Sequence, residues 1–152
     1  MLSTSFFHVG MVVPRLEEAL DHLGATLGLV WTPVVETDAP VGGGRLVPIR
    51  FAYSAEPPHL EVIEEAPGSV WVCNPHSNLH HIGFWADGLE GERDRLVASG
   101  CPLEVDGVAP EPDGTALYTY HADPLGLRLE LINTALRPLM EEGFAAARTA
   151  QP

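Results

Sequence analysis

Apolar positions in the first half of the chain predict one strand, one helix and three further strands. Residues 6–13 (FFHVGMVV) form a short apolar run that Pro14 ends, as is typical of a strand. Residues 15–28 place leucine and alanine at the spacing of one helical face, and Gly28 is a helix stop signal. Three further predicted strands cover 29–36, 46–54 and 59–65, with a loop at 37–45.

The second half repeats this order. A segment rich in proline and glycine at 66–78 separates it from the first half, and we expect no regular structure there. The predicted elements are a strand at 79–87, a helix at 88–100, and strands at 101–107, 115–123 and 127–133. Residues 136–152 are expected to form a short C-terminal helix with a frayed end.

The repeat extends to single residues. His81, Gly83 and Leu89 each follow their counterparts His8, Gly10 and Leu16 by 73 positions. The motif LEVIE, with its central Glu61, has a counterpart in LELIN, with Glu130, 69 positions later. Nearly equal offsets at separate points favour an internal duplication.

This register selects one histidine of the His80–His81 pair. Pairing His8 with His80 would lose the glycine and leucine matches. Because side chains alternate along a strand, His81, Gly83 and Trp85 are expected on one face, away from the predicted helix. We therefore expect His81 to face a cleft, and His80 to be a strand-end residue on the opposite face.

Four polar residues interrupt these apolar strands. Glu61 and Glu130 are each flanked by core-type residues, and carboxylates in that setting are rarely buried unless they are paired or bind metal. Together with His8 and His81 they could form a site for divalent zinc, nickel, cobalt, iron or manganese. The alternative is that both glutamates face solvent and both histidines are structural.

With these motifs, the sequence resembles the vicinal oxygen chelate superfamily, which includes glyoxalase I, methylmalonyl-CoA epimerase, extradiol dioxygenases and bleomycin- and fosfomycin-resistance proteins. The motifs HHIGF and DPLGLRLEL carry the resemblance. It implies an α+β fold in which two βαβββ units form a curved mixed sheet around a metal-binding cleft. One domain, 1–152, would contain units 6–66 and 78–135 and the tail 136–152. The implied metal ligands are His8, Glu61, His81 and Glu130.

The ligand set is similar to that of glyoxalase I, whereas the segments around His81 and Glu130 are closer to the methylmalonyl-CoA epimerase branch. Epimerases of that branch usually have glutamine where this chain has Glu61. They also use a glutamate on a strand of the first unit as one of two opposed bases. The corresponding segment here, 42–53, contains no carboxylate, so two-base epimerisation is not expected.

The resemblance implies a metal-dependent lyase or isomerase, epimerases included, that removes a proton next to a carbonyl while the metal stabilises an enediolate or enolate. Glu130 is the candidate proton shuttle. One alternative is a small-molecule binding protein of the antibiotic-resistance type, with or without metal. A third is an extradiol-type dioxygenase, which the fourth ligand, Glu61, disfavours because that chemistry needs an open two-histidine, one-glutamate face.

Two further residues are candidates for substrate contact. Trp85 shares a predicted strand face with His81 and could form a cleft wall, or it could be a core aromatic. His121 could line the cleft, or it could bond the turn at Asp123–Pro124. Arg45 and Arg50 could bind an anion, but solvated surface positions are the simpler interpretation.

Composition narrows the set of partners. The net charge of −13 disfavours nucleic acid and anionic membranes, and mildly disfavours a substrate with several phosphates. Two distant cysteines and an N-terminus without signal-peptide features favour a cytoplasmic protein. We also expect a homodimer acting on a small molecule, because members of this family commonly pair and the edge strand at 29–36 needs cover.

Overall fold

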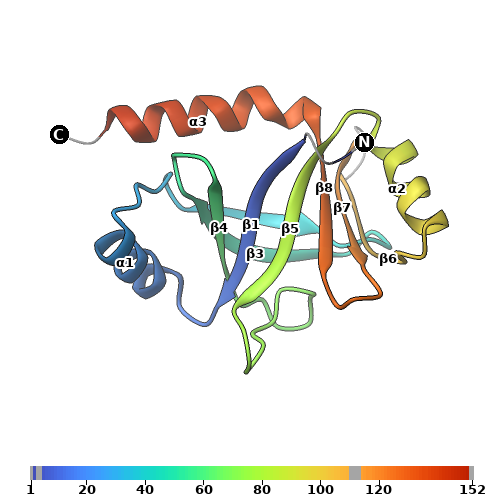
Figure 1. Cartoon of the computed structure of the whole chain (residues 1–152), viewed down its shortest axis with the longest axis horizontal. Helices are drawn as coiled ribbons and strands as arrows, with labels where there is room; N and C mark the ends of the chain where they lie inside the picture. Colours follow the sequence, from blue (N-terminus) through green and yellow to red (C-terminus); the bar gives the residue numbers. More distant parts are fainter. Residues whose placement is uncertain (1, 3–4, 110–113, 151–152) are drawn as a thin grey trace.

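The computed structural model describes residues 2, 5–109 and 114–150. In these residues the chain forms eight strands and three α-helices, arranged as two strand–helix–three-strand series (Figure 1). The first series is β1 (Phe6–Val13), α1 (Leu16–Leu27), β2 (Val35–Pro40), β3 (Leu46–Tyr53) and β4 (His59–Glu64). The second is β5 (Leu79–Ala86), α2 (Leu89–Ala98), β6 (Leu103–Val108), β7 (Ala116–Ala122) and β8 (Arg128–Asn133). A 3₁₀ turn, η2 (Thr134–Leu136), and the helix α3 (Arg137–Thr149) follow.

All eight strands belong to one sheet, in the order β2-β3-β4-β1-β5-β8-β7-β6. Each half has the same pairing, because β1 is parallel to β4 and β5 is parallel to β8. The halves join where β1 runs antiparallel to β5. The predicted α+β class and curved mixed sheet are confirmed.

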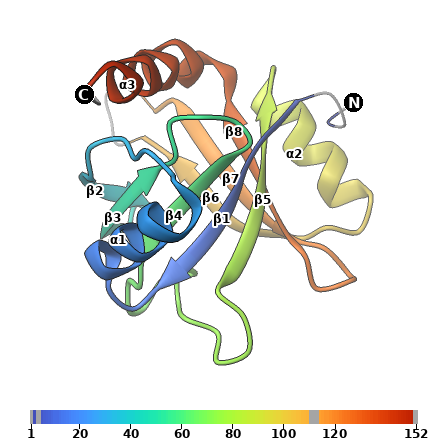
Figure 2. The same ribbon diagram turned by 60° about the vertical axis from the view of Figure 1, so that its left-hand side comes forward.

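The sheet curls until its two edge strands, β2 and β6, approach one another (Figure 2). A hydrogen bond spans the gap, since the Tyr118 hydroxyl on β7 donates to the Pro40 carbonyl on β2 at 2.6 Å. The eight strands therefore enclose an interior, as in a barrel that is nearly closed.

The predicted strand at 29–36 is wrong in its position. The strand β2 starts at Val35, and its sequence VETDAP is largely exposed, so apolarity does not mark it. The apolar residues before it instead pack under α1, where the Trp31 indole N–H donates to the Leu20 carbonyl. Pro33 has no N–H for a sheet hydrogen bond, which disfavours a strand there.

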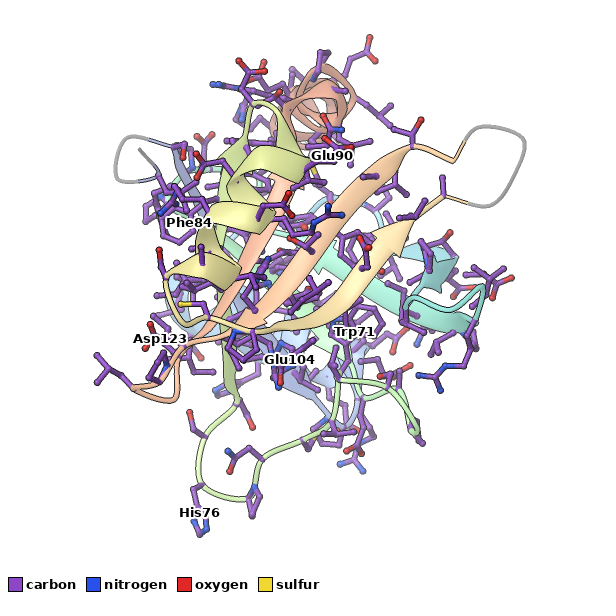
Figure 3. All side chains as sticks on the ribbon, turned by 90° about the vertical axis from the view of Figure 1, so that its right-hand side faces the viewer. Trp71, His76, Phe84, Glu90, Glu104 and Asp123 are labelled. Carbon is purple, nitrogen blue, oxygen red and sulfur yellow. The ribbon has the colours of Figure 1, made fainter. Side chains whose placement is uncertain are left out.

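The helices α1 and α2 cover the outer face of the sheet, one on each half. Leu16 and Leu20 of α1 pack on Val13 and Val62. On the other half, Leu89 and Leu96 of α2 pack on Leu131 and Ala86, and Phe84 lies beside this cluster (Figure 3). Each fully buried leucine contributes about 1.5–3 kcal/mol. Because the alternate residues of the central strands thus face the helices, the remaining ones face the interior.

The helix α3 crosses one end of the strands (Figure 1). Its Phe144 stacks on His59, and Arg148 donates to the Ala55 carbonyl at 2.7 Å. Earlier in the same helix, Met140 reaches the interior cavity. The C-terminal segment therefore closes part of the interior, a role that its sequence did not indicate.

Candidate metal centre

The four predicted metal ligands meet in the interior. His8, Glu61, His81 and Glu130 come from the four central strands, and each can offer one donor atom such that all four lie within 4.8 Å of one another. Their exposed fractions are between 0% and 6%. Strand register explains the convergence, because Gly10 pairs with both Glu61 and His81, and Gly83 pairs with both Glu130 and His8.

Two glycines make room for the imidazole rings. A Cβ atom on Gly10 would lie 1.9 Å from Cε1 of His81, and one on Gly83 would lie 2.2 Å from Cε1 of His8. Each histidine thus occupies the space over the glycine of the opposite half. The conformation of these glycines is ordinary, so the close approach is what requires them.

The geometry of the donor atoms favours a cation. The Nε2 atoms of His8 and His81 lie 2.8 Å apart and between 3.1 and 3.4 Å from Oε2 of both glutamates. Yet Oε2 of Glu61 and of Glu130 are buried without a hydrogen-bond partner among the described residues. Orphaned carboxylate oxygens of this kind are costly, and a divalent cation would satisfy them. The residues present therefore fit a metal such as zinc, nickel or cobalt.

Mutual electrostatics shifts the titration of this cluster. Burial alone would lower the pKa of His8, but the carboxylates of Glu130 and Glu61 outweigh it and raise this pKa to about 9. The pKa of His81 is raised in the same way against its burial. Conversely, burial would raise the pKa of Glu61 and Glu130, but the imidazoles hold both below the usual range. Without a cation, protonated imidazoles and ionised carboxylates therefore stabilise one another.

His80 does not lie on the opposite face, so that expectation was wrong. A register shift pairs Gly10 with His81 but Met11 with Leu79, which leaves His80 without a partner on β1 and interrupts the alternation of side chains. The ring instead approaches the metal-ligand candidate, with Nδ1 of His80 2.9 Å from Nδ1 of His81.

This contact can fix the tautomer of His81. An imidazole that offers Nε2 to a cation carries its proton on Nδ1, so His81 would donate to Nδ1 of His80. His80 can then donate from Nε2 to the Val70 carbonyl at 2.8 Å. Burial, the charge of His81 and that of Arg128 lower the pKa of His80 to about 4, which keeps it neutral and able to accept. In the other tautomer of His80, Nε2 would accept from the Arg128 guanidinium at 2.7 Å.

The two halves differ at this point. The counterpart of His80 in the first half is Phe7, whose ring packs edge-on against His8. Nδ1 of His8 has no hydrogen-bond partner in the described part of the chain. Thus only the second-half histidine is oriented by a polar neighbour.

Two tyrosines that the sequence pattern did not single out lie beside the centre. Tyr53 pairs with Glu61 across β3 and β4, and Tyr120 pairs with Glu130 across β7 and β8. Their rings stand edge-on to His8 and His81 at 5.3 and 5.1 Å between centroids. The signal was present, since Tyr120 follows Tyr53 by 67 positions, close to the offset of the glutamates.

The carboxylates and tyrosines open on a cavity of about 200 Å³. Three larger hollows, of about 730, 590 and 410 Å³, lie elsewhere, and neither Glu61 nor Glu130 is among the described residues that line them. We assign the chemistry to the smaller cavity because Glu61 and Glu130, two of the four convergent ligand candidates, line it, whereas size alone indicates no reaction.

The two predicted substrate-contact residues are not among the described residues that line this cavity. Trp85 stacks on Phe7 at 4.2 Å and lines the hollow of about 730 Å³. His121 alternates with Tyr120 along β7, so it faces the other side of the sheet, where it bonds Thr119 and the Cys101 carbonyl. Substrate contact by these two residues stays a prediction, and the geometry favours Tyr118 and Tyr120 instead.

Comparison with known proteins agrees with the fold. The family model of the Glyoxalase/Bleomycin resistance protein/Dioxygenase superfamily matches residues 7–119. The chain belongs to this superfamily. The matched segment contains His8, Glu61 and His81 and ends before Glu130. No curated protein sequence gives a significant match.

Solved structures of superfamily members share the architecture. A methylmalonyl-CoA epimerase in complex with methylmalonyl-CoA and NH4+ is 17% identical, with a TM-score of 0.56 over 85% of this chain and 93% of the other. A single-residue variant of the Streptomyces coelicolor epimerase, in complex with 2-nitronate-propionyl-CoA, has the same identity and score over 85% and 96%. The Mycobacterium tuberculosis epimerase is 18% identical, with a TM-score of 0.54 over 87% and 89%. At this identity the likeness shows the fold.

The contact between His80 and His81 predicts that His80→Phe, which copies the first half, weakens metal binding by about 10–100-fold. His80→Gln should retain more affinity, because its amide oxygen can accept from His81. The metal Kd is measured by competition with a chromogenic chelator. His76→Phe, in the exposed loop before β5, is the control. An unchanged Kd in His80→Phe would show that His80 does not position His81.

The raised pKa of His8 predicts how the stability of the metal-free protein depends on pH. With a folded pKa of about 9 against 6.5 unfolded, the stabilisation is complete below pH 6.5 and is lost as the pH rises through 9. The lowered glutamate pKa values stabilise above about pH 4.5 and lose that effect in acid. Urea unfolding in the presence of a chelator should therefore show a declining free energy of unfolding from pH 6.5 to 9. His8→Gln should flatten this decline and His76→Gln should not, whereas a wild-type rise over this window contradicts the assignment.

Proposed function

We propose that this protein is a metal-dependent isomerase or lyase that moves a proton next to a carbonyl group of a small substrate. The observation that carries the proposal is the buried set of two imidazoles and two carboxylates, with two orphaned carboxylate oxygens, at the wall of a cavity. Membership of the superfamily and the epimerase-like fold are consistent with this class of reaction.

His8, Glu61, His81 and Glu130 would hold the cation. A bound divalent cation supplies Lewis acidity, which lowers the pKa of a C–H bond beside a carbonyl and stabilises the negative charge that forms on oxygen. The remaining chemistry belongs to the chain. In a hydroxycarbonyl substrate, one carboxylate takes the C–H proton and the C–H electron pair moves into the carbonyl to give an enediolate. The same carboxylate then returns the proton to the neighbouring carbon, while the remaining hydroxyl proton passes to the former carbonyl oxygen.

Glu130 suits the role of proton carrier better than Glu61. Burial and the neighbouring Glu61 carboxylate raise the pKa of Tyr53, so its hydroxyl stays protonated and can donate to Glu61, the residue opposite it on β4. The equivalent Tyr120 hydroxyl instead accepts from the Trp71 indole N–H at 3.3 Å. Because the Tyr120 hydroxyl has this second partner, we propose Glu130 rather than Glu61 as the carboxylate that moves.

A second, opposed base is not favoured. On β3, where the family resemblance places such a base, the side chains that line the cavity are Ile49, Phe51 and Tyr53. The other carboxylate among the described lining residues, Asp38 on β2, is exposed. A route with one carboxylate therefore fits this chain better than two-base epimerisation. A binding protein of the antibiotic-resistance type, which would hold a ligand in the cavity without proton exchange, is the competing function and an outcome of the test below.

We also propose a homodimer, on a surface other than the predicted edge. The sheet edges approach each other and need no cover. The outer face of β1 and β5 instead lies between α1 and α2 (Figures 1 and 2). Phe6 and Leu79 on these strands are 45% and 51% exposed, and Met11, which pairs with Leu79, is half-buried. A second copy of the chain could bury this exposed apolar patch with its own equivalent patch.

A cytoplasmic location is proposed with it, because Cys73 and Cys101 are both free. No described helix is long and apolar enough to cross a membrane.

The metal proposal predicts one divalent ion per chain in protein purified without chelator, measured by mass spectrometry. His8→Ala, His81→Ala, Glu61→Ala and Glu130→Ala should lower metal affinity by orders of magnitude, because each removes a ligand. Glu130→Gln should retain more metal than Glu130→Ala and lose proton exchange between a hydroxycarbonyl probe and deuterated water. Circular dichroism checks the folding of each variant.

Two results would contradict the proposal in different ways. Wild-type protein that binds no divalent ion at any metal concentration tested would contradict the metal-dependent reaction. Tight ligand binding by metal-loaded protein without any proton exchange would favour the binding protein.

The dimer proposal predicts a sedimentation coefficient of a dimer at micromolar concentration. Phe6→Glu should shift the protein to monomer, because a buried unpaired charge is costly at an interface. Leu125→Glu, at a side chain 94% exposed in the turn between β7 and β8, should leave the dimer intact. A wild-type protein that sediments only as a monomer would sink this proposal.

A further inference from the structure

We infer that the substrate joins its two adjacent oxygens to a compact apolar or aromatic group, and that it is not a coenzyme A thioester. This inference rests on the metal centre proposed above and adds the class of molecule bound there. It separates this chain from the structurally similar epimerases, whose structures hold coenzyme A compounds.

The cavity is walled by apolar and aromatic side chains. Phe51 and Tyr53 on β3 and Tyr118 and Tyr120 on β7 form two matching edge-on pairs, with centroids 5.8 and 5.7 Å apart. Ile63, Trp71 and Ile132 continue this wall. Such a surface favours a flat or branched apolar group over a hydrated one.

The closure of the barrel limits the size of the ligand. The cavity holds about 200 Å³, which is below the roughly 300–1,000 Å³ of pockets that bind drug-sized ligands. The hydrogen bond from Tyr118 to Pro40 closes the side between β7 and β2. Leu136 and Met140, at the start of the C-terminal helical segment, close another side. A ring-sized group fits, whereas a long phosphopantetheine arm has to remain outside.

The cavity offers no positive charge from the chain. No arginine, lysine or histidine is among the described residues that line it, whereas Asp38, Glu61 and Glu130 are. A second anionic group on the substrate, beyond the one that a cation could bind, would therefore meet carboxylates. This argues for a substrate that is neutral or carries a single negative charge.

The surface is equally poor in partners for phosphate. All eight basic residues are arginines, and every one of them already has a hydrogen bond or ion pair. Arg50, for example, binds Glu17, Glu36 and Glu64. Arg45 donates to the Gly68 carbonyl at 3.0 Å. The protein's net charge of −13 would repel a ligand with several phosphates, and such a ligand would have to displace the existing arginine pairs.

The test uses hydroxamates, which chelate metals through two adjacent oxygens. Cobalt-loaded protein is titrated with acetohydroxamate and with benzohydroxamate, followed by cobalt absorption, and each Kd is divided by that of the free ion. Benzohydroxamate should bind at least tenfold more tightly after this correction, because its phenyl ring fills the apolar cavity. Methylmalonyl-CoA at the same concentration should not displace it.

A pair of neighbouring residues supplies the matched variants. Met140→Ala removes part of the cavity wall and should reduce the preference for benzohydroxamate by about threefold or more. Leu139→Ala, at a side chain 69% exposed on the same helix, should leave the preference unchanged.

The outcomes distinguish this inference from the function on which it rests. The protein could bind cobalt but bind the two hydroxamates equally, or release benzohydroxamate when methylmalonyl-CoA is added. Either result would overturn the proposed substrate class and leave the metal centre intact. Protein that takes up no cobalt, measured before any hydroxamate is added, overturns both.

Discussion

The antiparallel pairing of β1 with β5 is the constraint on which the rest of the structure depends. It sets His8 over Gly83 and His81 over Gly10, so each half provides the space that the other half's imidazole occupies. A shift of one residue would move the glycine away from each ring and turn the histidine of the shifted strand toward the helices. The parallel neighbours β4 and β8 then carry their glutamates to the same point.

Much of this arrangement could be predicted from the sequence, because the duplication allows each assignment in one half to be checked against the other half. Periodicity located both outer helices and most strands, and the offset between the copies selected His81 over His80. The strand β2 was misplaced because it is an exposed edge whose residues are mostly polar, so its position depends on pairing with β3 rather than on its own pattern.

At single residues the structure departs from the sequence pattern for a different reason. His80 left the expected face because of an irregular register with β1, which no spacing within β5 reveals. Trp85 shares a strand face with His81, but Phe7 and Phe144 fill the space beside it. His121 and Tyr120 are neighbours on opposite faces of β7, and the sequence alone favours the histidine because an imidazole can act as acid, base or hydrogen-bond donor near neutral pH. The cavity wall comes from aromatic residues that pattern alone assigns to a core.

The equal division of the ligands has a consequence for cooperativity. Each half supplies one imidazole and one carboxylate, too few to complete the four-coordinate site of a closed metal centre. An ion shared by both halves would lose two ligands at once if either half unfolded. Its binding would therefore raise the free energy needed to unfold one half separately from the other. The occupied centre would link the two halves at the middle of the sheet, so that the two duplicated units unfold as a single cooperative unit.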